Sequence, residues 1–194
     1  RAAEAAQAAA ERAAAVTGYS SGIPGVPVSY TPGAVTSGGG GGCAPAAPHG
    51  YANGFLPDDV LCPLPGRPGA RLRTDAAQSF VAMDAARTAA GLPRLCVTDS
   101  YRDYAGQLSV FARKPGLAAV PGRSQHGWGL AVDFCGGVER FDGEAHLWML
   151  ANAPRFGWIH PAWAEPGGSK PEAWHWEFQG GRPGDGTAGA TPGN

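Results

Sequence analysis

The sequence lacks the features that mark several large classes of protein. Its formal net charge is −1 over 194 residues, so it has no excess of one sign that would favour nucleic acid or anionic lipid. No apolar run approaches the roughly 20 residues that a membrane-spanning helix needs. None of the four cysteines stands in a C-x-x-C pair, which argues against a structural zinc knuckle or a thioredoxin-like redox site. What remains is a chain long enough for one domain with a substantial core.

The cysteines that are present form an even set, Cys43, Cys62, Cys96 and Cys135. In a Gly/Pro-rich domain of this size, an even set favours two disulfides and an oxidising compartment, and the alternative is four buried thiols in a cytosolic protein. If the strands that carry Cys96 and Cys135 are neighbours, these two can form a bridge, which leaves Cys43 to pair with Cys62. Four cysteines allow three pairings, and the sequence alone does not choose among them.

Composition divides the chain into four parts. Residues 1–16 are dominated by Ala and favour a helix, which we interpret as the remnant of a stalk or of a coiled coil with a partner; a frayed surface helix is the alternative. Residues 17–50 contain a glycine run and five prolines, which is typical of a linker. We expect the folded domain at 51–179 and a disordered tail at 180–194. Because the chain does not begin with Met, we expect it to be processed or trimmed, and a removed signal peptide stays open.

Within the folded part, periodicity and capping residues predict three helices and four short strands. Thr74 can cap a helix over 74–90 that Gly91 ends, and a second helix from about residue 103 should carry Tyr104, Leu108 and Phe111 inward. A third helix is expected over 143–151, and strands are expected over 95–97, 129–135, 157–160 and 173–178. The helices come in blocks and do not alternate strictly with strands. This order predicts an α+β fold with a small antiparallel sheet and flanking helices.

Two segments carry residues that can bind a metal. In the strand 129–135, Asp133 points away from the apolar side chains, and His126 arrives from the Gly-rich loop before it. In the last strand, His175 points away from its aromatic neighbours, and Glu172 precedes it by three residues. Two His and one Asp suit a catalytic zinc with an open fourth position, and a nearby carboxylate can take a proton from water. Each residue taken alone is equally compatible with a surface His or a turn-capping Asp.

The order of these motifs resembles one known family. The stretch S-Q-H-G-W-G-L-A-V-D is similar to the S-x-H-x-x-G-x-A-x-D pattern of VanY-like D-alanyl-D-alanine carboxypeptidases, and E-A-W-H is similar to their E-x-x-H. That metallopeptidase group also contains lysostaphin-type endopeptidases and the hedgehog signalling domain. The resemblance covers about residues 51–178 and implies a fold of the hedgehog/D-Ala-D-Ala-peptidase kind. It implies that His126, Asp133 and His175 bind zinc and that Glu172 is the catalytic base.

The family also has an S-x-Y-R element before the metal motifs. Here the chain reads T-D-S-Y-R instead of S-G-Y-R, which leaves the conformation of the turn open. By resemblance, Arg102 steadies the carbonyl or carboxylate of the substrate, and a guanidinium suits a carboxylate or a developing oxyanion for independent reasons; a solvated arginine is the alternative. The remaining residues expected to contact substrate are Ser100, Tyr101, Gln107, Ser124 and Trp174.

The resemblance implies a secreted or extracytoplasmic bacterial enzyme that releases D-alanine from peptidoglycan stem peptides. An endopeptidase of the same group, a non-catalytic zinc-containing wall-binding module and a structural spacer are the alternatives. Of the other histidines, we expect His49 to be solvated in the linker and His146 to be exposed on its helix. His160 is a weaker candidate for lining the cleft and contacting a transition state. The tryptophans are expected in the core and the cleft walls.

Overall fold

The computed structural model describes residues 50–179. The predicted stalk, nearly all of the linker, the tail, Cys43 and His49 lie outside the described residues, and the predictions about them stay predictions. No helix within residues 50–179 is both long and apolar enough to cross a membrane.

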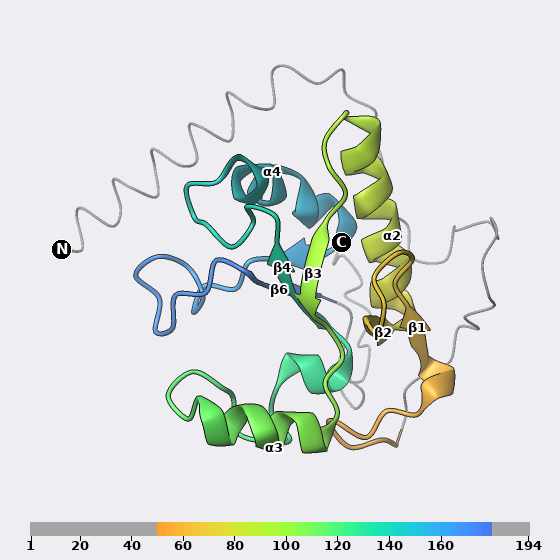
Figure 1. Ribbon diagram of the computed structural model, residues 1–194, viewed down its shortest axis with the longest axis vertical. Coiled ribbons are helices and arrows are strands. Elements are labelled where there is room, and N and C mark those ends of the chain that lie inside the picture. Colours follow the sequence, from red (N-terminus) through yellow and green to blue (C-terminus); the bar gives the residue numbers. More distant parts are fainter. Residues whose placement is uncertain (1–49, 180–194) are drawn as a thin grey trace, which may run out of the picture.

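The described part is built around a four-stranded antiparallel sheet (Figure 1). Its strands are β3 (Cys96–Asp99), β4 (Ala131–Cys135), β5 (Trp158–Ile159) and β6 (His175–Phe178), in the order β3-β4-β6-β5. A separate hairpin pairs β1 (Leu61–Pro63) with β2 (Arg71–Arg73). The predicted α+β class with a small antiparallel sheet is confirmed.

Three α-helices flank the sheet: α2 (Thr74–Ala89), α3 (Tyr104–Arg113) and α4 (Glu144–Asn152). Short 3-10 helices lie at η2 (Asp58–Val60), η3 (Gln125–Trp128) and η4 (Ala153–Phe156). The starts of all three α-helices and the ends of α2 and α4 agree with the predicted ones to within a residue. The prediction that Thr74 caps α2 is wrong, because Thr74 is the first helical residue and Arg73 stands at the N-cap without a side-chain capping hydrogen bond. Gly91 follows α2 with a φ of 75°, a left-handed conformation in which glycine has no steric cost.

The sheet has one apolar face and one polar face, as the period-two alternation predicts. Leu130, Val132 and Phe134 join the core, and α2 covers this face because its Phe80 stacks on Phe134 with ring centroids 6.1 Å apart. Phe80 also meets Trp158 of β5 edge to face. The opposite face, which carries Asp133, is therefore left open for a site.

Two predictions about burial are wrong. Leu108 is 48% exposed, because α3 lies at the periphery (Figure 1) and Gln107 is its only buried residue. His146, expected at the surface, is fully buried in α4, where its Nδ1 donates to the carbonyl of Val138 and its ring meets Trp176. Placement of the helices against other segments decided both cases.

A disulfide joins Cys96 and Cys135, the first residue of β3 and the last of β4. The two residues are directly opposite in the antiparallel register, and their Cα atoms lie 4.8 Å apart. The bridge therefore ties the outer strand of the sheet to its neighbour. The other expected pairing involves Cys43, which lies outside the described residues.

Candidate metal centre

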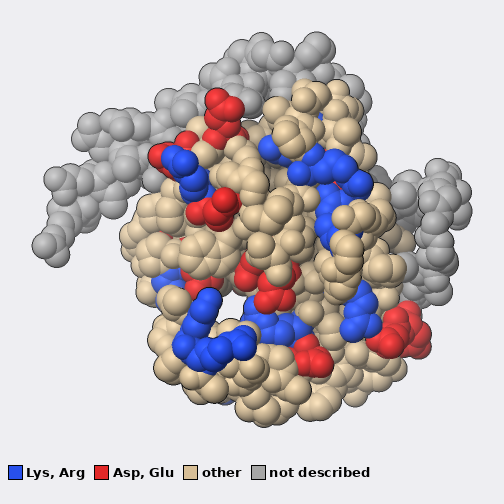
Figure 2. All heavy atoms as spheres, in the orientation of Figure 1, with Lys and Arg blue, Asp and Glu red and all other residues tan. Residues whose placement is uncertain are grey.

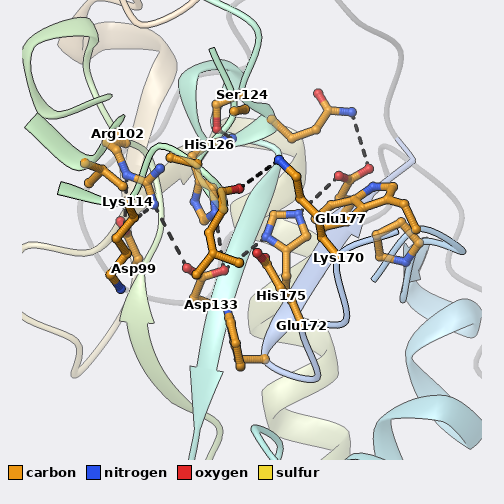
Figure 3. A pocket seen from close by; sticks show the side chains of 18 of the residues that line it. Asp99, Arg102, Lys114, Ser124, His126, Asp133, Lys170, Glu172, His175 and Glu177 are labelled. Atoms are coloured by element: carbon orange, nitrogen blue, oxygen red, sulfur yellow. Dashed lines mark hydrogen bonds and ion pairs between the residues drawn. The ribbon is translucent and has the colours of Figure 1, made fainter. Parts of the chain in front are cut away.

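Three predicted ligand residues converge on the open face of the sheet. One donor atom from each of His126, Asp133 and His175 lies within 4.8 Å of the others. Asp133 of β4 is directly opposite His175 of β6 in the strand register, so two of the three are neighbours by sheet geometry. Asp133 Oδ1 lies 3.1 Å from His175 Nδ1 and 3.3 Å from His126 Nε2. Figure 3 shows both rings turned toward this carboxylate.

The loop before β4 brings His126 to this cluster. Ser124 caps η3 by accepting a hydrogen bond from the His126 amide, and η3 ends at Gly129, which has a φ of 63°. A side chain on Gly127 would overlap the amide of Asn53, since a Cβ there would lie 2.2 Å from Asn53 Oδ1. Gly129 thus supplies the left-handed conformation at the bend that the sequence predicted, and Gly127 leaves the space that Asn53 occupies.

Each histidine of the cluster has its second ring nitrogen held by an acceptor. His126 Nδ1 donates to the carbonyl of Ser100 at 2.8 Å, which leaves Nε2 with its lone pair toward the cluster. His175 Nε2 donates to Glu177 Oε1 at 3.1 Å, which leaves Nδ1 facing Asp133. Metal-binding histidines usually have an outer partner of this kind. The two-His, one-Asp donor set, with both rings oriented, fits a catalytic zinc site.

The charges of the cluster are strongly coupled. Burial opposes ionisation of Asp133, but the charge of His126 and hydrogen bonds from both histidines outweigh it and hold the pKa of this carboxyl well below its usual range. Burial also disfavours the charged form of His175. Hydrogen bonds to Asp133 and Glu177 overcome that effect and raise its pKa to about 9. The carboxylates therefore attract a cation at this point, and a metal ion would compete with protons for it.

Glu172 lies beside the cluster with its backbone held and its carboxylate free. Its amide donates to Ala164, and its carbonyl accepts from the amide of His175 at 3.0 Å and from His160 Nε2 at 3.0 Å. Within residues 50–179 the carboxylate itself makes no hydrogen bond or ion pair. Burial, followed by the nearby charge of Asp133, raises the pKa of Glu172 against the opposing effect of the histidines. Such a carboxylate can accept and return a proton.

Arg102 faces the cluster from the turn after β3. Its Nη2 lies 2.5 Å from Asp99 Oδ2 and 4.0 Å from Asp133 Oδ2, and its Nη1 donates to Gln107 Oε1 at 2.7 Å. Asp99 stands in the unusual T-D-S-Y-R turn, so the departure from the family pattern supplies a partner for the arginine. Gln107 is almost fully buried, also donates to the carbonyl of Ala119, and therefore lies behind Arg102.

A cleft of about 750 Å³ opens over these residues. His126, Asp133, Glu172 and Arg102 line it, together with Ser124 and Trp174 from the predicted set. Trp174 belongs to the turn before β6 and not to the strand, which is why it does not share the core face of Trp176. Trp163 forms a further part of the wall, since its ring lies 4.9 Å from that of His175.

Three of the predicted substrate-contacting residues do not line this cleft: Gln107, which lies behind Arg102, and Ser100 and Tyr101. Ser100 is buried, and its hydroxyl accepts a hydrogen bond from the amide of Arg71, while its carbonyl orients His126. The Tyr101 hydroxyl accepts from the amide of Leu56 at 3.0 Å, and its ring packs against a small apolar cluster. Ser100 and Tyr101 therefore support the turn that presents Arg102.

Two acidic residues near the site, Glu177 and Glu165, were not predicted from the sequence. His160, predicted to line the cleft, lies elsewhere. Glu177 could have been found, because it lies two residues after His175 and so shares its face of the strand. Glu165 carries no such signal, since a loop brings its Oε1 to 3.0 Å from His160 Nδ1. His160 itself is buried, with 1% of its side chain exposed, and contacts the backbone of Glu172 and not the open cleft.

Comparisons with known proteins agree with this geometry. The family model for VanY, described as D-alanyl-D-alanine carboxypeptidase, matches residues 69–181, more than half of the chain. A curated D-alanyl-D-alanine carboxypeptidase from Enterococcus faecalis (strain ATCC 700802 / V583) is 39% identical over 66 residues, which are 32% of this chain and 25% of that relative. The matched segment thus spans a quarter of the length of the curated relative.

Two solved structures resemble the fold and retain some sequence similarity. One is VanYB in complex with D-alanine-D-alanine, with 27% identity, a TM-score of 0.51 and coverage of 62% of this chain and 77% of that one. The other is a mutant of the vancomycin-resistance D,D-pentapeptidase VanY from a VanB-type cassette, in complex with Zn(II), with 27% identity, a TM-score of 0.50 and coverage of 62% and 78%. The D,D-dipeptidase VanXYg, at 19% identity and a TM-score of 0.51 over 70% of this chain and 62% of that one, shares the fold.

Proposed function

The chain belongs to the VanY family of D-alanyl-D-alanine carboxypeptidases, and on this premise we propose that it is a zinc-dependent peptidase that removes the terminal D-alanine from peptidoglycan stem peptides. One observation carries the proposal. A two-His, one-Asp donor set and the unpaired carboxylate of Glu172 lie in the same cleft. A purely structural spacer would need neither feature.

The zinc ligands and Glu172 have separate roles in the proposed reaction. His126, Asp133 and His175 hold the zinc ion, with the outer ring nitrogens fixed by Ser100 and Glu177. Zinc in such a site acts as a Lewis acid toward a carbonyl and makes water more acidic. Glu172 accepts the proton of the attacking water and later returns it to the leaving amine, which its burial and raised pKa favour.

Arg102 holds the substrate at the scissile bond. Its guanidinium is oriented by Asp99 and Gln107 and still lines the cleft. A planar fork suits the terminal carboxylate or the charge that develops on the carbonyl oxygen. Ser124 and Trp174 are the predicted substrate contacts that lie in the same cleft.

We also propose that residues 51–179 form the catalytic unit and that the protein acts outside the cytoplasm at the bacterial cell wall. The peptidoglycan substrate of the family and the Cys96–Cys135 disulfide support that location. Partnering through a coiled coil at residues 1–16 stays a separate proposal.

The direct test is release of D-alanine from a stem pentapeptide ending in D-Ala-D-Ala. Wild type should release it, chelation should abolish release, and added zinc should restore it. Glu172→Gln should retain zinc but lose about 10²- to 10⁴-fold in kcat, while Glu144→Gln, an exposed glutamate on α4, should behave as wild type. Internal cleavage would favour the endopeptidase, and zinc binding without any cleavage would favour the binding module.

A further inference from the structure

The cleft extends from the metal centre to the loop that follows α3, and its two ends differ in charge. Asp133, Glu172 and Glu177 line the metal end. The lining also carries four cationic side chains, Arg113, Lys114, Arg123 and Lys170, of which Lys170 lies near Glu172 (Figure 3). Figure 2 shows Lys and Arg side chains gathered around a hollow, with acidic side chains on its other side.

Three of these cations have no partner in the described part of the protein, and the fourth makes one hydrogen bond across the cleft. Among the described residues, the side chains of Arg113, Lys114 and Arg123 make no hydrogen bond or ion pair. Lys170 reaches across the cleft from the opposite wall, and its Nζ donates to the carbonyl of Leu117 at 3.1 Å (Figure 3). Arg102, in contrast, is paired with Asp99 and Gln107.

Local structure explains only part of this arrangement. Arg113 is in the last turn of α3 and Lys114 is its C-cap, where the helix dipole favours cations. Arg123 and Lys170 lie outside any helix, so the dipole does not account for them. Four like charges from two different walls repel one another unless an anion lies between them. The arrangement therefore indicates a binding site for a negatively charged group.

We propose that this cationic wall, formed by Arg113, Lys114, Arg123 and Lys170, binds a second carboxylate of the peptide, on the acyl side of the bond that is cut. The inference rests on the proposed function and names its substrate class: stem peptides whose acyl side is acidic are preferred over those in which it is amidated or basic. Lys170 then exchanges the carbonyl of Leu117 for the substrate carboxylate.

Two groups of a stem peptide have this chemistry. One is the free main-chain carboxylate of a γ-linked glutamate at the second residue, and the other is the side-chain carboxylate of diaminopimelate at the third. Because Arg113, Lys114 and Arg123 are exposed, each charge should contribute modestly, about fivefold or less. Salt should weaken the preference, since the Debye length is only about 10 Å at 0.1 M.

The test compares three synthetic pentapeptides that all end in D-Ala-D-Ala. The first has both free carboxylates, the second has its glutamate carboxylate amidated, and the third has lysine in place of diaminopimelate. For each we would measure kcat/KM for D-alanine release at low and high salt. The second and third peptides separate the two sources of the carboxylate.

The same peptides are then given to Lys114→Gln, Arg123→Gln and the double variant. The matched control is Arg140→Gln, which removes an exposed arginine that pairs with Asp142 and lies outside the cleft lining. Thermal unfolding and zinc content verify that each variant is folded and loaded. The wild type and the control should prefer the acidic peptide by about fivefold to 25-fold, and this ratio should fall severalfold in the double variant, which keeps only Arg113 and Lys170 of the four cations.

Equal kcat/KM values of wild type for all three peptides would overturn the inference and leave the proposed function intact. An acid preference as large in the double variant as in wild type would also overturn it. Release of D-alanine from none of the three peptides overturns the proposed function, and the inference with it.

Discussion

Glu177 offers a sharp test of how the metal centre is built. Its Oε1 accepts a hydrogen bond from His175 Nε2 at 3.1 Å, and both side chains are mostly buried. The carboxylate therefore orients the ring and increases the electron density at Nδ1, the nitrogen that faces the cluster. We expect Glu177→Ala to weaken zinc binding even though Glu177 is not a ligand.

The size of the effect follows from the geometry. Loss of an outer-shell partner of a ligand histidine typically lowers metal affinity by about 10- to 100-fold, which corresponds to about 1.4–2.7 kcal/mol. A buried donor left without an acceptor also costs about 1–3 kcal/mol of folding free energy, a cost that the metal-free and the zinc-bound protein share. Glu177→Gln keeps an acceptor oxygen but loses the charge, so its affinity should lie between those of Glu177→Ala and wild type.

The assay is a competition titration of zinc between the protein and a chromophoric chelator, with circular dichroism to verify folding without metal. Glu144→Ala removes an exposed carboxylate on α4 and should bind zinc as wild type does. A Glu177→Ala protein with wild-type zinc affinity would refute the assignment of Glu177 as the group that positions His175. A loss confined to kcat at full zinc occupancy would equally contradict it.

Three further outcomes are expected. Arg102→Lys keeps the charge but loses the planar guanidinium that Asp99 orients. Its kcat/KM for D-alanine release should therefore fall about 10²-fold at unchanged zinc content. A fall of less than about threefold would argue against substrate anchoring by Arg102. The double change Cys96→Ser and Cys135→Ser opens a loop of 39 residues and should lower the free energy of unfolding by about 4 kcal/mol, measured in urea; an unchanged midpoint would contradict this. His160→Leu removes the donor to the Glu172 carbonyl and should lower kcat about tenfold with little change in KM, whereas His160→Gln, which keeps a donor, should lose less; equal losses would point to packing alone.

Local patterns predicted most of the fold. Gly91 ends α2 because a left-handed glycine acts within a few residues, whereas Thr74 begins the helix without capping it. Alternation in β4 assigned Val132 to the core and Asp133 to the open face, since side chains of a strand alternate between its faces. The same patterns were insufficient for Leu108 and His146, whose burial depends on which segments pack against their helices.

By itself, then, the sequence determined the α+β class, the order of the elements and the residues that can bind a metal, since spacing and residue chemistry are local properties. Only the tertiary structure decided that Asp133 is directly opposite His175, because strand register is a contact between segments 42 residues apart. It alone also brought Lys170 across the cleft to the carbonyl of Leu117, 53 residues away in sequence. Such contacts depend on how distant segments pack, and no local pattern encodes them.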